Sequence, residues 1–289
     1  MIVPPRAKPL AFDPELASPR GFTPPAISDG DFSKLRALVL QLTGISLSDQ
    51  KKALVVGRLG PRLRHRKIDS FGAYHQLLQS PSEKDELQIA IDLITTNETS
   101  FFREAEHFEV LKDYIQHLRP VPFPFRVWSA ASSSGEEAYT IAMVLSEVLG
   151  SAEWNVLGTD ISTRVLERAR KALYPMERAA MIPRRYLERH CLKGQGRHEG
   201  LFMVDRPLRE RVSFVQANLC KPLPKLGPFQ VAFLRNILIY FDLPQKKRVV
   251  EEVMAQIKPG GLLIVGHSES ITGLCEGLTQ VRPTIYRVS

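Results

Sequence analysis

The stretch Arg126–Glu137, Arg-Val-Trp-Ser-Ala-Ala-Ser-Ser-Ser-Gly-Glu-Glu, begins as a short apolar run, passes through a loop of small residues and enters a helical pattern at Gly135. Strand, loop and helix in this order are typical of the first βα unit of a doubly wound α/β domain. Small side chains let a ligand approach the backbone closely, and ligands of open sheets bind at the carboxyl ends of strands. The stretch therefore predicts a ligand site. An ordinary βα turn, with a capping Ser and two first-turn acids, is the alternative.

The composition of this loop limits which ligand it can hold. Three serines, Ser132–Ser134, precede a single Gly135, so the Gly-x-Gly-x-x-Gly pattern of dinucleotide sites is absent. A carboxylate at Glu137 would repel a pyrophosphate and attract hydroxyls or a cation. A nucleoside-type ligand other than a dinucleotide fits better.

The next strand supports this interpretation. The run Trp154–Thr159 reads as a second strand and ends in Asp160. An acidic residue at this position of such a fold commonly accepts hydrogen bonds from ribose hydroxyls. Capping of the helix Thr163–Leu173 is the alternative role for Asp160, although Ser162 could supply that cap.

Composition sets the class of protein. The chain has 289 residues, 44% of them hydrophobic and 24% charged, as expected for a globular protein without membrane insertion. Three widely spaced cysteines fit a reducing cytoplasm, and the seven histidines show no metal-ligand spacing, so no metal is expected. The net charge of +8 suggests an acidic partner: nucleic acid, membrane or protein.

The N-terminal third divides into a Pro-rich tail and a helical domain. Residues 1–30 should be extended and largely disordered, and residues 31–94 carry four helical patterns. One of them, Gln50–Lys67, contains seven cations and no acid, which favours a docking surface for an acidic partner. Gly60-Pro61 should kink or interrupt this helix.

Residues 95–125 form a linker and a helix, Glu106–Leu118. The linker contains Thr95-Thr-Asn-Glu-Thr-Ser-Phe-Phe-Arg-Glu104, which packs hydroxyl residues, two Phe and one Arg closely together. One interpretation is a capped linker that the two Phe anchor in the core. The other is that the linker forms one wall of the ligand site, with Arg103 as a fixed cation.

Residues 126–289 complete the α/β domain with about seven strands, and residues 174–212 interrupt it. Two short strand-like runs flank Gly194-Gln-Gly196 in this insert. Its sheet edge could accept an extended peptide or could be decoration.

These motifs together resemble the class I S-adenosylmethionine-dependent methyltransferases and, more narrowly, the CheR family of chemotaxis receptor methyltransferases. The resemblance rests on residues 95–104, Val127–Tyr139, Asn236 through Tyr240-Phe-Asp242, and Gly266-His-Ser-Glu269. It covers the chain from about residue 31 onward. Gly60-Pro61 and Ser132-Ser133 depart from the usual family pattern.

The resemblance implies a seven-stranded methyltransferase domain with an inserted antiparallel β-subdomain, preceded by an all-α domain. The latter docks, through helix 50–67, on the helical bundle of a chemoreceptor. In some members the subdomain, here 174–212, tethers a C-terminal receptor pentapeptide. The residues implied to contact the cofactor are Asn97, Thr99, Arg103, Ala131, Glu137, Asp160, Asn218, Leu219, Arg235 and Asn236. Arg103 and Tyr240 are implied to place the substrate carboxylate.

The implied reaction transfers a methyl group from S-adenosylmethionine to receptor glutamates, leaving S-adenosylhomocysteine. A glutamate carboxylate is already ionised at neutral pH, so no general base is needed. A nucleic-acid amino-methyltransferase usually has Asp/Asn-Pro-Pro-Tyr/Phe where Arg235-Asn-Ile-Leu238 stands, so no nucleic-acid partner is expected. The alternative function is that of a non-catalytic protein that binds the cofactor only as a regulatory signal. A monomer is expected, since no long coiled coil or exposed apolar stripe is present.

Overall fold

The computed structural model describes residues 24–118 and 120–289, so most of the predicted Pro-rich tail, 1–30, lies outside the described residues. The chain forms two compact units. The first contains the described residues up to Gln41 together with Leu47–Glu98. The second contains Leu42–Ser46 and Thr99–Ser289. In the part of the chain that is described, no helix is long and apolar enough to span a bilayer.

The first unit is helical, as predicted. Its elements are α1 (Asp29–Thr43, whose last residues belong to the second unit), the 3-10 turn η2 (Asp49–Lys51), α2 (Lys52–His65), α3 (Phe71–Leu78) and α4 (Lys84–Ile94). Their apolar faces bury Leu35, Leu59, Leu63, Tyr74 and Leu93, each less than a tenth exposed. The Ser70 hydroxyl caps α3 by accepting a hydrogen bond from Ala73 N.

The basic helix is longer than the expected interruption at Gly60-Pro61 would allow. The helix α2 continues through Pro61 to His65, without the predicted interruption. Gly60 is buried there, and a Cβ on it would lie 2.7 Å from Pro24, so the glycine is required by close packing.

Three cations of residues 50–67 have counter-ions from outside this segment. Arg62 donates to Glu86 with Nε–Oε1 at 2.9 Å, and Arg66 lies 2.8 Å from Glu83. Lys52 pairs with Asp29. The sequence pattern missed these pairs because the acids stand outside 50–67. The exposed cations of the segment are Lys51, Arg64 and Lys67.

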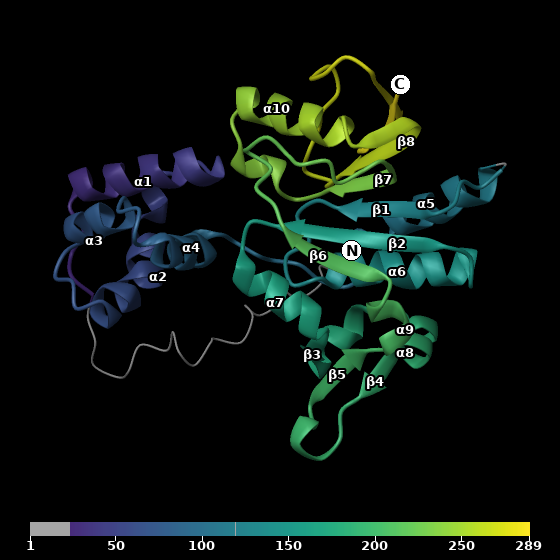
Figure 1. Ribbon diagram of the computed structural model, residues 1–289, viewed down its shortest axis with the longest axis horizontal. Coiled ribbons are helices and arrows are strands. Elements are labelled where there is room, and N and C mark those ends of the chain that lie inside the picture. The colour runs from purple at the N-terminus through teal and green to yellow at the C-terminus, as the bar shows by residue number, and fades with distance from the viewer. Residues whose placement is uncertain (1–23, 119) are drawn as a thin grey trace, which may run out of the picture. The chain divides into compact units, whose positions relative to one another are not determined.

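The second unit is built on one seven-stranded sheet with the strand order β6-β2-β1-β7-β8-β10-β9, which confirms the predicted fold class (Figure 1). The strands are β1 (Phe125–Ser129), β2 (Trp154–Asp160), β6 (Val212–Gln216), β7 (Phe229–Leu234), β8 (Ile257–Val265), β9 (Leu278–Arg282) and β10 (Ile285–Val288). The first five pair in parallel, and β10 is antiparallel to both β8 and β9.

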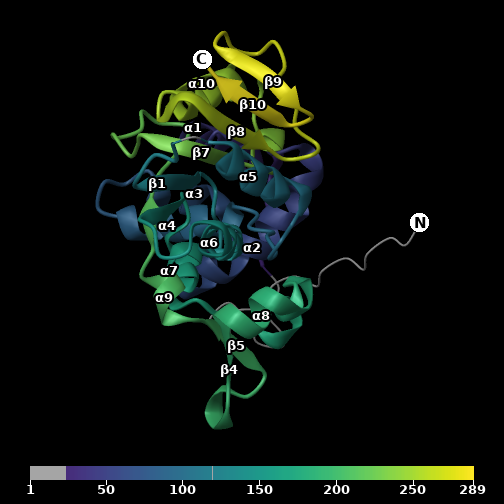
Figure 2. The same ribbon diagram turned by 90° about the vertical axis from the view of Figure 1, so that its right-hand side faces the viewer.

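Alternating side chains of the strands feed two cores, one on each face of the sheet. Val127, Val156 and Phe233 pack with the helices α5 (Glu106–His117), α6 (Glu136–Leu149) and α7 (Thr163–Lys171). Trp128, Leu157 and Leu234 face the other way, toward α10 (Leu243–Met254). The sheet is therefore the middle layer of three, as Figures 1 and 2 show.

The insert between α7 and β6 forms a separate antiparallel sheet of order β3-β5-β4, as predicted in kind. Its elements are β3 (Leu173–Pro175), η3 (Met176–Met181), α8 (Arg184–His190), β4 (Cys191–Lys193), η4 (Gly196–His198), β5 (Leu201–Val204) and α9 (Arg206–Arg209). β3 is a short edge strand of this sheet, where its Pro175 is tolerated.

Candidate active site

The strand order defines where a ligand should bind. From β1 the chain builds outward through β2 to β6, then returns to add β7 and β8 on the other side of β1. The order reverses between β1 and β7, and open α/β sheets bind ligands outside the carboxyl ends of the strands at such a point. Three charged residues stand at this edge: Asp160 at the end of β2, Glu137 in the first turn of α6 and Arg235 directly after β7.

The small-residue loop after β1 is held against β2. Ser132 N donates to Thr159 O at 2.8 Å, and Gly135 N donates to Ser132 O at 2.9 Å. Gly135 has φ +93°, and a Cβ there would lie 2.9 Å from Ala169 and 3.1 Å from the Tyr174 hydroxyl. The predicted turn into α6 therefore needs glycine at this position.

Asp160 lies at the end of β2 and is 8% exposed. Its carboxylate accepts hydrogen bonds from Ser133 N at 3.0 Å and Ser162 N at 2.9 Å. The Ser162 hydroxyl caps α7 by accepting from Val165 N. The Asp160 carboxylate therefore fixes the loop after β1 to the loop after β2.

Arg235, in the loop after β7, is the charged centre of the site. Its side chain is 1% exposed and bridges two acids, with Nη1 3.0 Å from Glu137 Oε2 and Nη2 3.0 Å from Glu104 Oε2. Nη2 also donates to the carbonyl of Arg103, and the guanidinium carbon lies 5.6 Å from the Phe108 ring centre. One buried cation therefore joins the linker, the start of α6 and β7.

The two acids respond differently to this cation. Burial acts to raise the pKa of the Glu104 carboxyl, but Arg235 and Asn236 outweigh it and the pKa is lowered. For Glu137, burial prevails over Arg235 and over the hydrogen bond from Ser129, so its pKa is raised. The Ser129 hydroxyl donates to Glu137 Oε1 at 2.7 Å.

Sequence reasoning missed the role of Glu269. This carboxylate is 5% exposed and accepts from four backbone amides. The donors are Gly266 N, Asn236 N and Leu238 N at 2.7 Å each, and Ile239 N at 3.3 Å. It fixes the loop after β7, including Asn236 at φ +57°, to the loop after β8. Only the Gly266-His-Ser-Glu motif marked this residue in the sequence.

The insert reaches the same loops. Tyr174 Oη donates to Ser134 O at 2.7 Å, and Arg178 donates to Thr99 O at 2.6 Å. Arg178 also lies 3.4 Å from the fully buried carboxylate of Glu136, whose pKa is raised by that burial. The insert is therefore in direct contact with the loop after β1.

The remaining predicted site residues lie as follows. Asn218 follows β6; its amide donates to Leu42 O, and its Oδ1 accepts from Cys220 N. Leu219 is buried, Ala131 and Arg103 are half-buried, and Tyr240 is half-buried in the turn η5 (Leu238–Tyr240). Asn97 belongs to the first unit, where its amide donates to Thr95 Oγ1 at 3.3 Å.

The residues at the strand ends fit a nucleoside-type ligand. A fixed carboxylate stands at Asp160, and small side chains line the loop after β1. Two buried polar atoms, Ser132 Oγ and Arg235 Nε, have no hydrogen-bond partner among the described residues. Buried polar atoms are normally paired, so a bound ligand with polar groups would suit this edge.

Comparisons with known proteins identify the ligand class. Residues 97–286 match the model of the CheR methyltransferase, SAM binding domain, and residues 30–95 match the CheR methyltransferase, all-alpha domain. The fold and the site therefore define an S-adenosylmethionine-dependent methyltransferase. The chain belongs to the CheR methyltransferase family.

Relatives agree over most of the chain. The chemotaxis protein methyltransferase of Escherichia coli is 41% identical, with 91% of this chain and 92% of that protein covered. Chemotaxis protein methyltransferase 2 of Pseudomonas aeruginosa is 39% identical, with 89% of this chain and 92% of that protein covered. Among solved structures, the glycopeptide N-methyltransferase MtfA with S-adenosylmethionine is 18% identical, with a TM-score of 0.34 and coverage of 60% and 58%.

Proposed function

We propose that this chain methylates the side-chain carboxylates of glutamates on chemoreceptors, using S-adenosylmethionine and forming glutamate methyl esters. The observation that carries the proposal is the family match over both units, together with relatives named as chemotaxis protein methyltransferases. S-adenosylmethionine supplies an electrophilic methyl group on a sulfonium. The glutamate carboxylate of the substrate has a pKa of about 4.3 and is ionised at neutral pH. The enzyme therefore does not need a general base to remove a proton from it.

The residues of this chain then act by binding and alignment. Asp160 accepts hydrogen bonds from the ribose hydroxyls, as an acid at the end of the second strand commonly does. Two backbone amides hold its carboxylate in place for this contact. Glu137, positioned by Ser129 and Arg235, holds a further polar group of the same ligand. The other proposed contacts are Asn97, Thr99, Arg103, Ala131, Asn218, Leu219, Arg235 and Asn236. Alignment of the reacting groups can lower the barrier by roughly 7–11 kcal/mol.

Arg103 and Tyr240 are the proposed contacts of the incoming carboxylate. A guanidinium at Arg103 orients it by charge and by paired N–H groups, and the Tyr240 hydroxyl donates one hydrogen bond. Both residues are half-buried, which leaves them accessible to a protein substrate.

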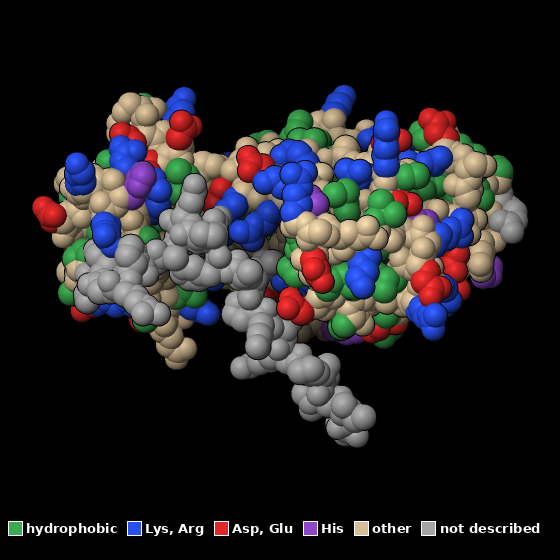
Figure 3. Space-filling model, turned by 90° about the horizontal axis from the view of Figure 1, so that it is seen from below, with side chains coloured by type: hydrophobic (Ala, Val, Ile, Leu, Met, Phe, Trp, Pro, Cys, Tyr) green, Lys and Arg blue, Asp and Glu red, His purple; other side chains and the backbone are tan. Residues whose placement is uncertain are grey.

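Two finer proposals concern partners. We propose that the exposed cations Lys51, Arg64 and Lys67 of residues 50–67 contact an acidic face of the receptor's helical bundle. Figure 3 shows Lys and Arg side chains at many places on one face of the molecule. We also propose that the edge of the small sheet in 174–212 binds an extended receptor segment by strand addition. Leu192 on the edge strand β4 is 60% exposed.

The first test is calorimetric titration with S-adenosylhomocysteine. Micromolar affinity in the parent chain, lost in Asp160→Ala, supports the pocket. Incubation with a receptor cytoplasmic fragment and methyl-labelled S-adenosylmethionine should then give label that alkali releases as methanol. Affinity without any labelled ester would favour the cofactor sensor instead.

The substrate contacts need a separate readout. Tyr240→Phe removes one hydrogen bond, so kcat/KM for the receptor fragment should fall about tenfold, the equivalent of about 1.4 kcal/mol. Its affinity for S-adenosylhomocysteine should stay unchanged. Arg103→Lys keeps the charge and loses the paired geometry, and unchanged turnover in this variant would assign Arg103 a structural role.

A further inference from the structure

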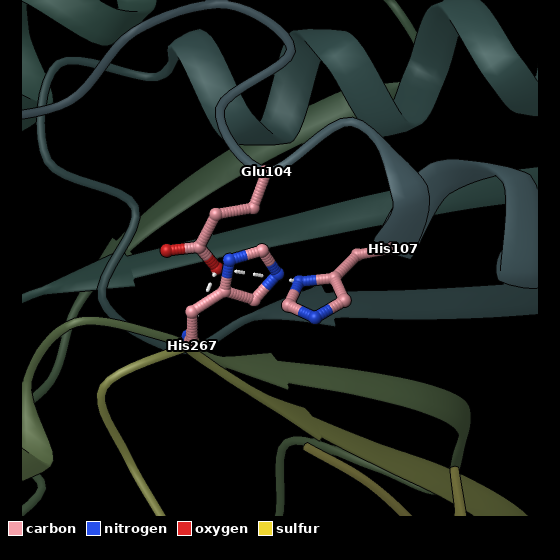
Figure 4. Close-up of side chains that lie close together, drawn as sticks. All are labelled: Glu104, His107 and His267. Carbon is pink, nitrogen blue, oxygen red and sulfur yellow. Dashed lines mark hydrogen bonds and ion pairs between the residues drawn. The ribbon is translucent and has the colours of Figure 1, made fainter. Parts of the chain in front are cut away.

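Three metal-ligating side chains meet beside the cofactor site. Glu104 stands in the turn before α5, His107 in the first turn of α5, and His267 in the loop after β8 (Figure 4). One ligand atom from each lies within 4.8 Å of the other two. The histidines come from distant parts of the sequence, so ligand spacing along the chain could not reveal them.

The hydrogen bonds of His107 fix its tautomer. His107 Nε2 lies 2.9 Å from Thr284 Oγ1, and that hydroxyl donates its proton to Pro283 O at 2.6 Å. A carbonyl can only accept a hydrogen bond, so the Thr284 hydroxyl proton is used in the bond to Pro283 O and is not available to His107. His107 Nε2 must therefore carry the hydrogen, and Nδ1 of the neutral ring presents a lone pair.

This lone pair faces an anion. His107 Nδ1 is buried, 3.5 Å from Glu104 Oε2, and has no hydrogen-bond partner among the described residues. Two acceptors at this distance repel unless a cation lies between them.

The separation suits a tetrahedral metal ion. Zn²⁺ binds histidine nitrogen and carboxylate oxygen at about 2.0–2.2 Å, which places two ligand atoms of a tetrahedron roughly 3.4 Å apart. The observed distance between His107 Nδ1 and Glu104 Oε2 is 3.5 Å. We propose that Glu104, His107 and His267 form a binding site for a divalent transition metal ion of the Zn²⁺ type.

The neighbouring charges are mixed. Glu106 pairs with His267 Nε2, and a carboxylate on a ligand histidine is the usual support of a zinc site. Arg235 opposes the metal, because its guanidinium also binds Glu104 Oε2. The metal ion and Arg235 therefore compete for one carboxylate.

This competition couples the metal to the cofactor, an inference that rests on the proposed function. Glu104 also accepts a hydrogen bond from the Asn236 amide at 3.2 Å. Arg235 and Asn236 are both proposed cofactor contacts. A metal ion that draws Glu104 away should weaken cofactor binding, and the cofactor should weaken metal binding by the same factor.

The test is an absorption titration of the full chain with Co²⁺, followed by displacement with Zn²⁺. The parent chain should develop the visible bands of tetrahedral Co²⁺. His267→Gln should weaken binding at least about tenfold, since even loss of a supporting residue costs 10–100-fold. The His267 side chain is 47% exposed, so this variant should fold. The control, His65→Gln, changes an exposed histidine of α2 and should bind Co²⁺ as the parent chain does.

Absence of a tetrahedral Co²⁺ spectrum in the parent chain, or equal affinity in His267→Gln, overturns the site. Calorimetry with S-adenosylhomocysteine, with and without saturating Zn²⁺, tests the coupling separately. Weaker affinity with Zn²⁺ supports the coupling, and unchanged affinity refutes it. A chain that binds no S-adenosylhomocysteine refutes the proposed cofactor pocket, while the Co²⁺ titration still decides the metal site.

Discussion

Arg235 satisfies two carboxylates and one carbonyl with a single buried guanidinium. A lysine could not do the same, because its ammonium lacks the planar fork of donors. Arg235 therefore determines how the linker, α6 and the loop after β7 fit together, whatever ligand the site holds.

We expect Arg235→Gln to lower the free energy of unfolding of the second unit by about 3–5 kcal/mol, because it leaves Glu104 and Glu137 buried without their cation. Urea unfolding followed by tryptophan fluorescence measures this unit alone, since both tryptophans, Trp128 and Trp154, lie in it. The matched control is Arg282→Gln, whose pair with Asp113 is more than half exposed on both sides and should change stability by about 0–1 kcal/mol. Equal losses in the two variants would contradict this account.

Single residues were predictable where a local rule applied. Asp160 at the end of a strand, Ser162 as a helix cap and Gly135 in the turn follow from positions along the sequence. Glu269 was recognisable only as part of a family motif, because three of its four partners are backbone amides of a segment about 30 residues away in the chain. Hydrogen bonds to distant backbone leave no pattern in the sequence.

Among the elements, α2 and α4 are joined by a buried carboxylate. Glu86 accepts from Arg62 and from the Tyr74 hydroxyl at 2.7 Å, and its side chain is 1% exposed. Burial acts to raise the pKa of Glu86, but the hydrogen bonds from Arg62 and Tyr74 outweigh it, and the pKa is lowered.

A lowered carboxyl pKa in the folded state gives stability that is present above the unfolded pKa, about 4.3, and is lost as the pH falls through the folded value. Amide exchange protection of α2 and α4, corrected for intrinsic rates, should therefore fall as the pH drops below about 4.3. Glu86→Gln should be less protected at pH 7 and should lose the part of the acid dependence due to this group. An unchanged acid dependence in that variant would refute the assignment.

Element prediction failed where tertiary contacts override local rules. Pro61 did not interrupt α2. The strand β9 was missed because four of its five residues are exposed and carry no buried apolar pattern. The strand β3 has only three residues, one of them a proline. In contrast, β1 and β2 are largely buried runs and were predicted close to their observed bounds.

For the molecule as a whole, the positive charge is the property that bears on partners. Charge complementarity mainly raises association rates and is screened by salt. Much of the charge on α2 is used within the first unit, so the net charge of +8 overstates what a partner meets there.

We expect the combined variant Lys51→Glu, Arg64→Glu, Lys67→Glu to raise KM for the receptor fragment at least about tenfold at low salt, because electrostatic steering changes association by 10–10³-fold. Affinity for S-adenosylhomocysteine should not change. The control reverses three exposed cations of the second unit: Lys171, Lys225 and Arg287. An equal rise in KM in the control would show that total charge, and not this helix, governs docking.

The place of β10 in the sheet has a consequence for folding of the chain. β10 lies between β8 and β9, although the ribosome makes β9 before β10. One edge of β8 therefore stays unpaired during folding until residues 285–288 have docked between β8 and β9. An open edge is a template for pairing with other chains. The docking of these last residues should thus be the step before which the sheet is most prone to pair with other chains.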